Sequence, residues 1–242
     1  MPDLTTPSAR RMFVVLLAGT LGCGSDLLLP DSGGSGESFL EITRVTSAEL
    51  SGPVGEPLQP LIVKVLGADD QPAVGVEVAF ELSDAAAGIV DPPSTTTNSQ
   101  GEAVAHWTLG SVPGSYKAVA RLVGAGTEAA ALEFTAQASP GQPDTLSSQI
   151  PLDQPGRRQQ QVEDAPRVRV VDRFGNPVPN VPVAWQVISG EGTVANPITN
   201  TDAQGEATVE WTLGNRIGVH KLTAAIGSVT GSPITFTAVV YF

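Results

Sequence analysis

The sequence predicts an all-β fold of two tandem β-sandwich domains. Three observations support this prediction: abundant glycine and proline, short segments in which apolar and polar residues alternate, and a long internal repeat. The 242 residues include 26 glycines and 20 prolines, a composition that leaves little room for long helices and favours short strands joined by turns. With 41% apolar and only 16% charged residues, the chain can bury a core and is not globally disordered.

The amino-terminal segment has the pattern of a targeting signal. Two adjacent arginines precede an uncharged, mostly apolar run at 12–21, which is much shorter than the roughly 20 residues that span a bilayer. We therefore predict a removable signal peptide at residues 1–22. Leu21-Gly22-Cys23 resembles the lipobox of bacterial lipoproteins, and this resemblance implies a lipid anchor on Cys23. A plain secretory signal followed by a spare thiol is the alternative.

A short spacer follows the predicted signal. Residues 23–37 are rich in glycine and serine, a composition typical of flexible linkers. We predict a tether that lets the folded part stand away from the membrane. Because Cys23 is the single cysteine of the chain, neither an intrachain disulfide nor a cysteine-based zinc site can form.

The rest of the chain is a duplication with a period of about one hundred residues. The motif Gln-Gly-Glu-Ala occurs at 100–103 and again at 204–207, and further matches follow at the same offset of 104 residues. Such a period is too long for a solenoid repeat and right for a complete small domain. A linker that contains proline and glycine separates the two halves, so we place the domains at 38–138 and 144–242.

Each half reads as a series of strands with one buried face, because apolar residues occupy every second position. Early strands are expected near 39–44 and 61–65, and about seven strands per half is the strand number of an immunoglobulin-like sandwich. Phe80 and Trp185 stand where such sandwiches bury a large aromatic side chain. The predicted inward positions of the first half are Val74, Val76, Val78, Phe80, Leu82, Ala103, Ala105, Trp107, Leu109, Tyr116, Ala118, Ala120, Leu122, Leu132, Phe134 and Ala136. Those of the second half are Val181, Val183, Trp185, Val187, Ala207, Val209, Trp211, Leu213, His220, Leu222, Ala224, Ile226, Ile234, Phe236, Ala238 and Val240.

The order of turns and strands also resembles a known family. In the second half, a Val-rich strand leads to the loop 172–179, then to a second Val-rich strand and to the turn 201–207. This arrangement resembles the bacterial immunoglobulin-like domains of the invasin and intimin type, group 1. The first half fits less well, because its loop 67–72 lacks the Gly-Asn pair of the second. The resemblance implies two tandem immunoglobulin-like β-sandwich domains after a signal peptide and a flexible tether, and it specifies fold better than function.

The sequence offers little catalytic or metal chemistry. His106 and His220 do not recur between the halves, so we interpret the first as a surface residue and the second as a core or rim residue. The acidic pairs at 69–70 and 163–164 are interpreted as solubilising loop charge rather than as calcium ligands. We expect no catalytic residue, no cofactor and no metal site.

Trp107 and Trp211 could serve as platforms on which a sugar ring stacks. Both tryptophans alternate with apolar residues, however, so the core is the favoured place for them. The turns that contain Gly101 and Gly205 resemble active-site loops, but a glycine with positive φ in a tight turn explains them better.

Five arginines gather at the start of the second half and form a possible contact surface: Arg157, Arg158, Arg167, Arg169 and Arg173. They could meet an anionic surface or the first domain, which carries 12 acidic against 4 basic residues over 38–138. A solvated strand face is the alternative, and the alternation of Arg167 and Arg169 with valines favours it.

These features together favour a non-catalytic lipoprotein of the bacterial cell envelope. The formal charge of −12 argues against a nucleic-acid partner, because binding to nucleic acid needs a basic face. Its domains would serve adhesion or protein–protein interaction, with the membrane reached through the lipid anchor at the outer membrane or cell surface. The partner is an unknown protein or glycan. A structural spacer or assembly component of the envelope is one alternative, and a carbohydrate-binding accessory module is another.

Overall fold

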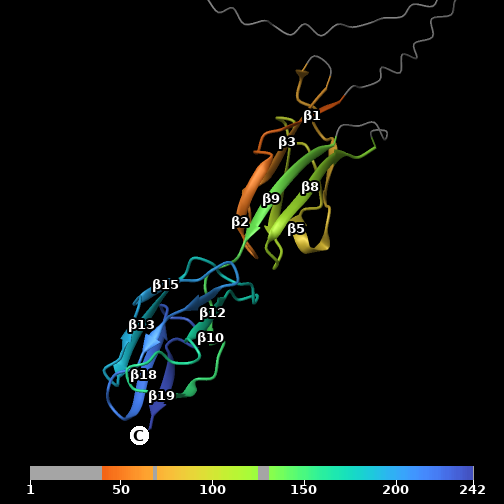
Figure 1. The fold of residues 1–242 in the computed structure, drawn as a ribbon. Helices are drawn as coiled ribbons and strands as arrows, with labels where there is room; N and C mark the ends of the chain where they lie inside the picture. The colour runs from red at the N-terminus through yellow and green to blue at the C-terminus, as the bar shows by residue number, and fades with distance from the viewer. Residues whose placement is uncertain (1–39, 68–69, 125–130, 242) are drawn as a thin grey trace, which may run out of the picture. The chain divides into compact units, whose positions relative to one another are not determined.

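The computed structural model describes residues 40–67, 70–124 and 131–241. The predicted signal peptide, the tether and Cys23 lie outside these residues, as does Asp69 of the first acidic pair. The predicted all-β fold is confirmed: the described residues form two β-sandwiches (Figure 1). Within the same ranges, no helix has the length and apolar composition that crossing a bilayer requires.

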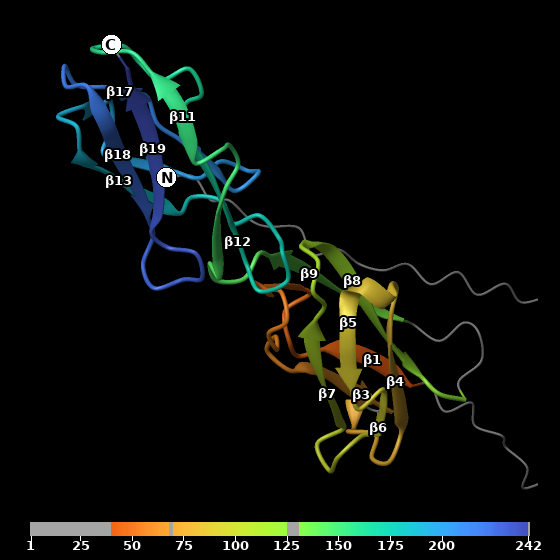
Figure 2. The ribbon, with the colours of Figure 1, turned by 90° about the horizontal axis from the view of Figure 1, so that it is seen from below.

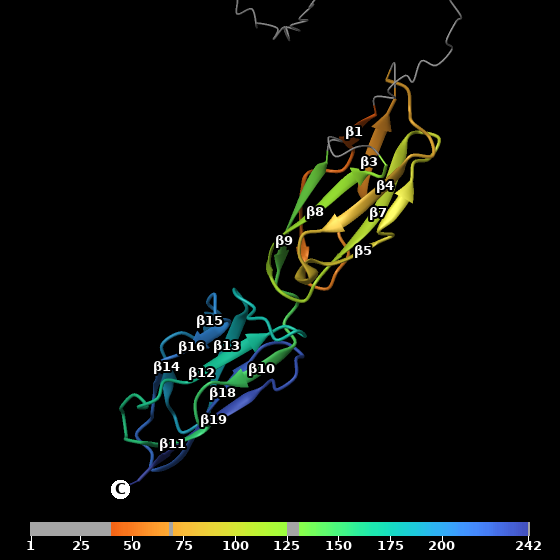
Figure 3. The same ribbon diagram turned by 90° about the vertical axis from the view of Figure 1, so that its right-hand side faces the viewer.

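The first sandwich consists of a four-stranded sheet in the order β1-β3-β7-β5 and a five-stranded sheet in the order β2-β9-β8-β4-β6. The central strands β4, β8 and β9 of the larger sheet lie side by side in Figure 3. A short 3-10 helix, η2 (Ala85–Ala87), precedes β5. The strands are β1 (Glu41–Arg44), β2 (Glu49–Pro53), β3 (Leu61–Leu66), β4 (Glu77–Leu82), β5 (Gly88–Asp91), β6 (Ser94–Thr96), β7 (Glu102–Leu109), β8 (Gly114–Leu122) and β9 (Leu132–Ser139).

The second sandwich repeats this plan. Its five-stranded sheet has the order β11-β19-β18-β13-β15, and the smaller sheet is divided into β10-β12-β16 and β14-β17. Strands β13, β18 and β19 are adjacent in Figure 2. The strands are β10 (Thr145–Ser148), β11 (Asp153–Gly156), β12 (Arg167–Val171), β13 (Pro182–Ser189), β14 (Thr193–Val194), β15 (Ile198–Asn200), β16 (Glu206–Thr208), β17 (Trp211–Thr212), β18 (Gly218–Ala225) and β19 (Ile234–Val240).

A proline accounts for the division of the smaller sheet in the second domain. In the first domain, Leu61 of β3 pairs with Ala105 of the continuous strand β7. Pro166 takes the place of Leu61 in the second domain, where its carbonyl accepts a hydrogen bond from the N–H of Val209 at 3.1 Å. Because proline has no N–H to return this bond, the ladder is interrupted and the counterpart of β7 becomes β16 and β17.

The predicted inward positions form the two hydrophobic cores. Trp107 and Trp211 are completely buried, and Phe80 and Trp185 are each 3% exposed, as expected from the alternation. Val74 is the exception, since it is 63% exposed. Strand β4 begins only at Glu77, and Val74 lies in the preceding turn. The core residues do not test the domain boundaries at 38–138 and 144–242, which stay predictions.

The expectation of about seven strands per domain is too low, because the described residues hold nine strands in the first domain and ten in the second. Strands β2 and β11 were not predicted. Their sequences, ELSGP and DQPG, contain glycine and proline and show little alternation. Each lies at the edge of its sheet, in parallel pairing with the last strand of its domain, and proline is tolerated at such edges.

The repeated Gln-Gly-Glu-Ala motif forms a tight turn in both domains. The Oδ1 atoms of Asn98 and Asp202 each accept two backbone hydrogen bonds, from the residues two and four positions later. Gly101 and Gly205 follow with φ of +75° and +73°, which confirms the interpretation of these motifs as turns. A Cβ on Gly205 would lie 2.5 Å from the carbonyl oxygen of Val170 on β12.

We predict that Gly205→Ala destabilises the second domain more than Gly175→Ala. Both glycines have positive φ, which costs an alanine about 1–2 kcal/mol, but a Cβ on Gly175 would meet nothing within 4 Å. The clash with the Val170 carbonyl adds to this cost only at Gly205. Urea unfolding of the two variants measures the difference, and equal losses of stability would contradict the proposed steric role.

Candidate functional site

Two of the five candidate arginines lie on one strand. Arg167 and Arg169 belong to β12, where Arg167 is exposed and Arg169 is half-buried. The Nη1 atom of Arg167 lies 3.7 Å from the Oε2 atom of Glu206 on the neighbouring strand β16. The Nε atom of Arg169 is buried and has no hydrogen-bond partner within the described residues. The structure therefore brings Arg167 and Arg169 together on the outer side of the small sheet, beside an acidic residue.

The other three arginines lie in loops. Arg157 and Arg158 are exposed in the turn that follows β11, and Arg173 is exposed in the loop that follows β12. The guanidinium of Arg173 lies 3.4 Å from a carboxylate oxygen of Glu56, an acidic residue of the first domain, and 4.7 Å from the centre of the Phe174 ring. A role for these five residues as a contact surface stays a prediction.

The loop after β12 is organised by Asp172, which is only 2% exposed. Its Oδ1 atom accepts hydrogen bonds from the backbone N–H groups of Phe174 and Asn176, both at 2.9 Å. Its Oδ2 atom accepts from the N–H of Gly141 at 2.8 Å and from the side-chain amide of Asn176 at 2.9 Å. One carboxylate thus fastens the loop and the linker residue Gly141 to the end of β12.

These contacts decide the ionisation of Asp172. Burial raises the pKa of the carboxyl group, but the hydrogen bonds from Asn176, Gly141 and Phe174 lower it by more than burial raises it. The pKa therefore lies below its ordinary value of 3.8. Asp172 was not among the predicted site residues. The donors at 174 and 176 form a local turn pattern that could have indicated it, whereas Gly141 is 31 positions away and gives no local signal.

The two histidines have the places expected for them. His106 is exposed, whereas His220 is 1% exposed. The Nε2 atom of His220 lies 2.9 Å from the carbonyl oxygen of Arg216, four residues earlier. Tyr116 occupies the matching position of the first domain, and its hydroxyl donates to the carbonyl of Val112, also four residues earlier, at 2.9 Å. His220 therefore contacts the loop before its strand as Tyr116 does in the first domain, which is a structural role.

All three tryptophans of the chain are buried in the cores. The indole N–H of Trp107 donates to the carbonyl of Ala87 at 2.9 Å, and that of Trp185 donates to the Thr199 hydroxyl at 2.8 Å. Trp211 is completely buried, and its indole nitrogen has no partner within the described residues. None of these rings can stack on a sugar from solvent. Within the described ranges, no group of three or more His, Cys, Asp or Glu residues could hold a metal ion.

Comparison with known proteins relates the second domain to a known family. The model of the bacterial Ig-like domain (group 1) matches residues 162–239. The second domain is therefore similar to the bacterial Ig-like domains of group 1. No curated protein matches the chain.

Several solved structures resemble the chain at low sequence identity. FdeC, an Escherichia coli adhesin, is 17% identical with a TM-score of 0.49, and the match covers 82% of this chain and 63% of FdeC. InvD of Yersinia pseudotuberculosis is 15% identical with a TM-score of 0.48, covering 84% of this chain and 57% of InvD. The D0-D1 domain of intimin is 17% identical with a TM-score of 0.34, covering 82% and 94%. The chain thus spans less than two thirds of the solved chains of FdeC and InvD. At sequence identities this low, the function of these proteins cannot be transferred to this chain.

We predict that Asp172→Asn lowers the free energy of unfolding of the second domain by about 1–3 kcal/mol at pH 7, since the new amide group cannot accept all four hydrogen bonds. The pKa of Asp172 is depressed in the folded state, so its stabilising effect is present above about pH 4 and is lost as the pH falls through the lower folded value. The difference between wild type and variant should therefore shrink on acidification.

Urea unfolding at pH 7 and at pH 3 measures this difference. Asp202→Asn is the matched control, because Asn98 already makes the same turn contacts in the first domain. We expect the control to be close to neutral. If the loss of unfolding free energy caused by Asp172→Asn were the same at both pH values, the role assigned to the ionised carboxylate would be contradicted.

Proposed function

We propose that the chain is a non-catalytic lipoprotein of the bacterial cell envelope that presents two Ig-like domains at the surface for adhesion or protein–protein interaction. The family match over residues 162–239 is the observation that carries this proposal, since it relates the second domain to bacterial Ig-like modules. The sequence adds Leu21-Gly22-Cys23 directly after an apolar run, the arrangement that resembles a lipobox. Anchor, tether and folded modules would then follow one another along the chain.

The burial of the tryptophans supports protein contact over carbohydrate binding. A sugar-binding module of this kind presents aromatic rings to solvent, and Trp107, Trp185 and Trp211 are at most 3% exposed. The contacts proposed here would instead use exposed sheet faces and loops, which are the parts of a β-sandwich that vary without disturbing its core.

Lipidation of Cys23 is tested by metabolic labelling. We expect the full chain, produced in a bacterium with radiolabelled palmitate, to take up label and to fractionate with membranes, because several acyl chains on one residue give a stable anchor. Cys23→Ser should lose both properties. A matched control moves the thiol by two positions, combining Cys23→Ser with Ser25→Cys, and should stay unlabelled. Label retained by Cys23→Ser would refute the anchor.

Surface presentation is tested on intact cells. We expect protease added outside the cells to cleave the wild-type chain, and cells that carry it to bind immobilised host matrix proteins more strongly than cells that carry Cys23→Ser. Total amounts of the two chains are matched by immunoblot. A wild-type chain that is protected from protease until the outer membrane is opened would contradict surface presentation and favour a component that works inside the envelope.

A further inference from the structure

The outer faces of the two five-stranded sheets differ sharply in charge. In the first domain, this face carries six exposed charged side chains: Glu49, Glu77, Glu81, Lys117, Arg121 and Glu133. Lys117 pairs with Glu133 at 2.7 Å, and Arg121 pairs with Glu81 at 3.3 Å. Glu77 accepts a hydrogen bond from the Ser94 hydroxyl at 2.9 Å. This face is therefore a hydrated, internally paired surface.

The same positions can be identified in the second domain from the strand register. Glu81 lies opposite Val119 as Gln186 lies opposite Thr223, and Glu49 lies opposite Thr135 as Asp153 lies opposite Thr237. Four of the six charged side chains are replaced by uncharged ones. The replacements are Pro182 for Glu77, Gln186 for Glu81, Ala225 for Arg121 and Thr235 for Glu133.

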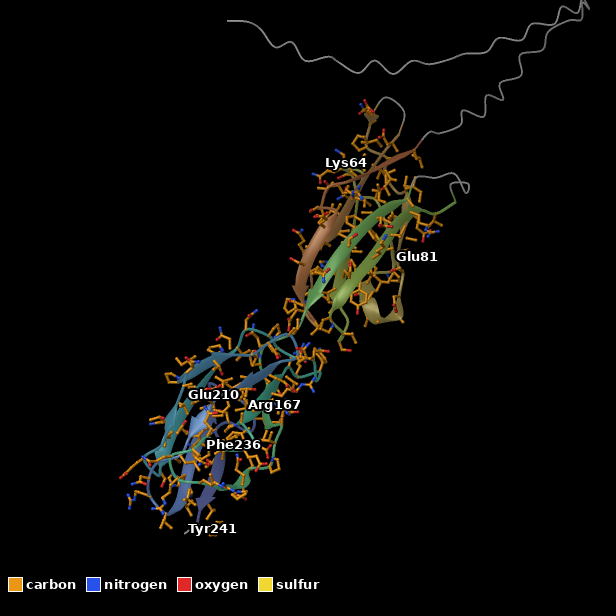
Figure 4. All side chains as sticks on the ribbon, in the orientation of Figure 1. Lys64, Glu81, Arg167, Glu210, Phe236 and Tyr241 are labelled. Atoms are coloured by element: carbon orange, nitrogen blue, oxygen red, sulfur yellow. The ribbon has the colours of Figure 1, made fainter. Side chains whose placement is uncertain are left out.

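Apolar side chains have also replaced polar ones on the second face. Val219 pairs with Val239 where the first domain pairs Ser115 with Gln137. Ile198, at the position of Ser94, is 61% exposed, and Val219 is 49% exposed. Tyr241, which follows β19 and is labelled in Figure 4, is 69% exposed. A neutral, partly apolar face fits the core of a protein interface, where charged residues are depleted.

Among the described residues, only two charged side chains remain on this face, and their arrangement is self-complementary. Lys221 on β18 and Asp153 on β11 both lie opposite Thr237 of β19, one on each side of it. Neither takes part in an ion pair between described residues of the chain. A two-fold axis that runs parallel to β19 above Thr237 would exchange the two sides of the face. It would bring Lys221 of one molecule over Asp153 of the other, twice.

We propose that this face, made by β11, β19, β18 and β13, binds the same face of a second copy of the chain. The two-fold relation makes the contact isologous, with two equivalent Lys221–Asp153 pairs between the copies. Two twisted sheets can pack face to face with nearly aligned strands. Ala184, Thr223 and Thr235 are small residues on this face and leave room for such packing. The inference does not depend on the proposed function, because it concerns the folded domain alone.

Charge and area both bear on this choice of occupant. The chain has a formal charge of −12, so most of its surface repels a second copy, whereas this face carries one positive and one negative side chain. The strands β11, β19, β18 and β13 hold 4, 7, 8 and 8 residues, and at about 3.3 Å per residue and about 4.8 Å per strand they give a face of roughly 430 Å². Two such faces bury roughly 860 Å², which is below the roughly 1,000 Å² of a stable specific interface and in the range of weak, transient contacts. We therefore expect a weak, concentration-dependent dimer.

The test exchanges the two charges. Sedimentation velocity of the full chain carrying Cys23→Ser, over a wide concentration range, should reveal a reversible dimer. Lys221→Asp places two acidic side chains opposite two others, and Asp153→Lys does the same with bases, so each variant alone should associate at least tenfold more weakly. An equimolar mixture of the two variants should associate at least as strongly as the parent chain, because every pair is then restored between unlike molecules.

Lys117→Asp, on the matching face of the first domain, is the control and should leave the association constant unchanged. Both tested side chains are exposed, and circular dichroism checks that the variants fold alike. A parent chain that stays monomeric at every concentration would overturn the inference, as would variants that associate as strongly as the parent or a mixture that fails to restore association. These results would leave the palmitate and protease tests of the proposed function untouched.

Discussion

The alternation of buried and exposed side chains is the constraint on which both domains depend. No disulfide can join the sheets, because the chain has a single cysteine, so the cores rest on packing between inward-facing side chains. Trp107 and Trp211 occupy the same place in the two domains and are fully buried. A one-residue slip of any central strand would turn its apolar side chains to solvent, so the register of those strands is firmly fixed.

The turns are held by the same side-chain hydrogen bonds in both domains. Thr97 and Thr201 are buried and donate from their hydroxyls to backbone carbonyls of the preceding loop, Ala73 and Val178. The acceptor that follows them is Asn98 in one domain and Asp202 in the other, so a shared oxygen matters there and not the charge. At Asp172 the situation is reversed, because four donors converge on one carboxylate.

Local sequence patterns were sufficient to predict the central strands of the sheets but not the edge strands β2 and β11. The period of two identified β7, β8, β9 and their counterparts, since each has one face in the core. Strands β2 and β11 could not be predicted from local sequence, because they form by pairing with β9 and β19, which lie more than 80 residues later in each case. The arginine surface shows the same limit. Arg167 and Arg169 share a strand, but the acidic neighbours of Arg167 and Arg173 come from distant segments.

Duplication makes the outer faces informative, because the two domains share a core and a register and differ where the core imposes nothing. If the outer face of a five-stranded sheet needed only to be soluble, the charged pattern of Lys117 with Glu133 and Arg121 with Glu81 would serve in both domains. In the second domain the three pair members other than the lysine are replaced by Thr235, Ala225 and Gln186, while the lysine remains as Lys221. Lys221 and Asp153 are kept on the two sides of Thr237, while the partner that the lysine has in the first domain, Glu133, is replaced by Thr235. This is the pattern of a surface shaped by contact rather than by hydration alone.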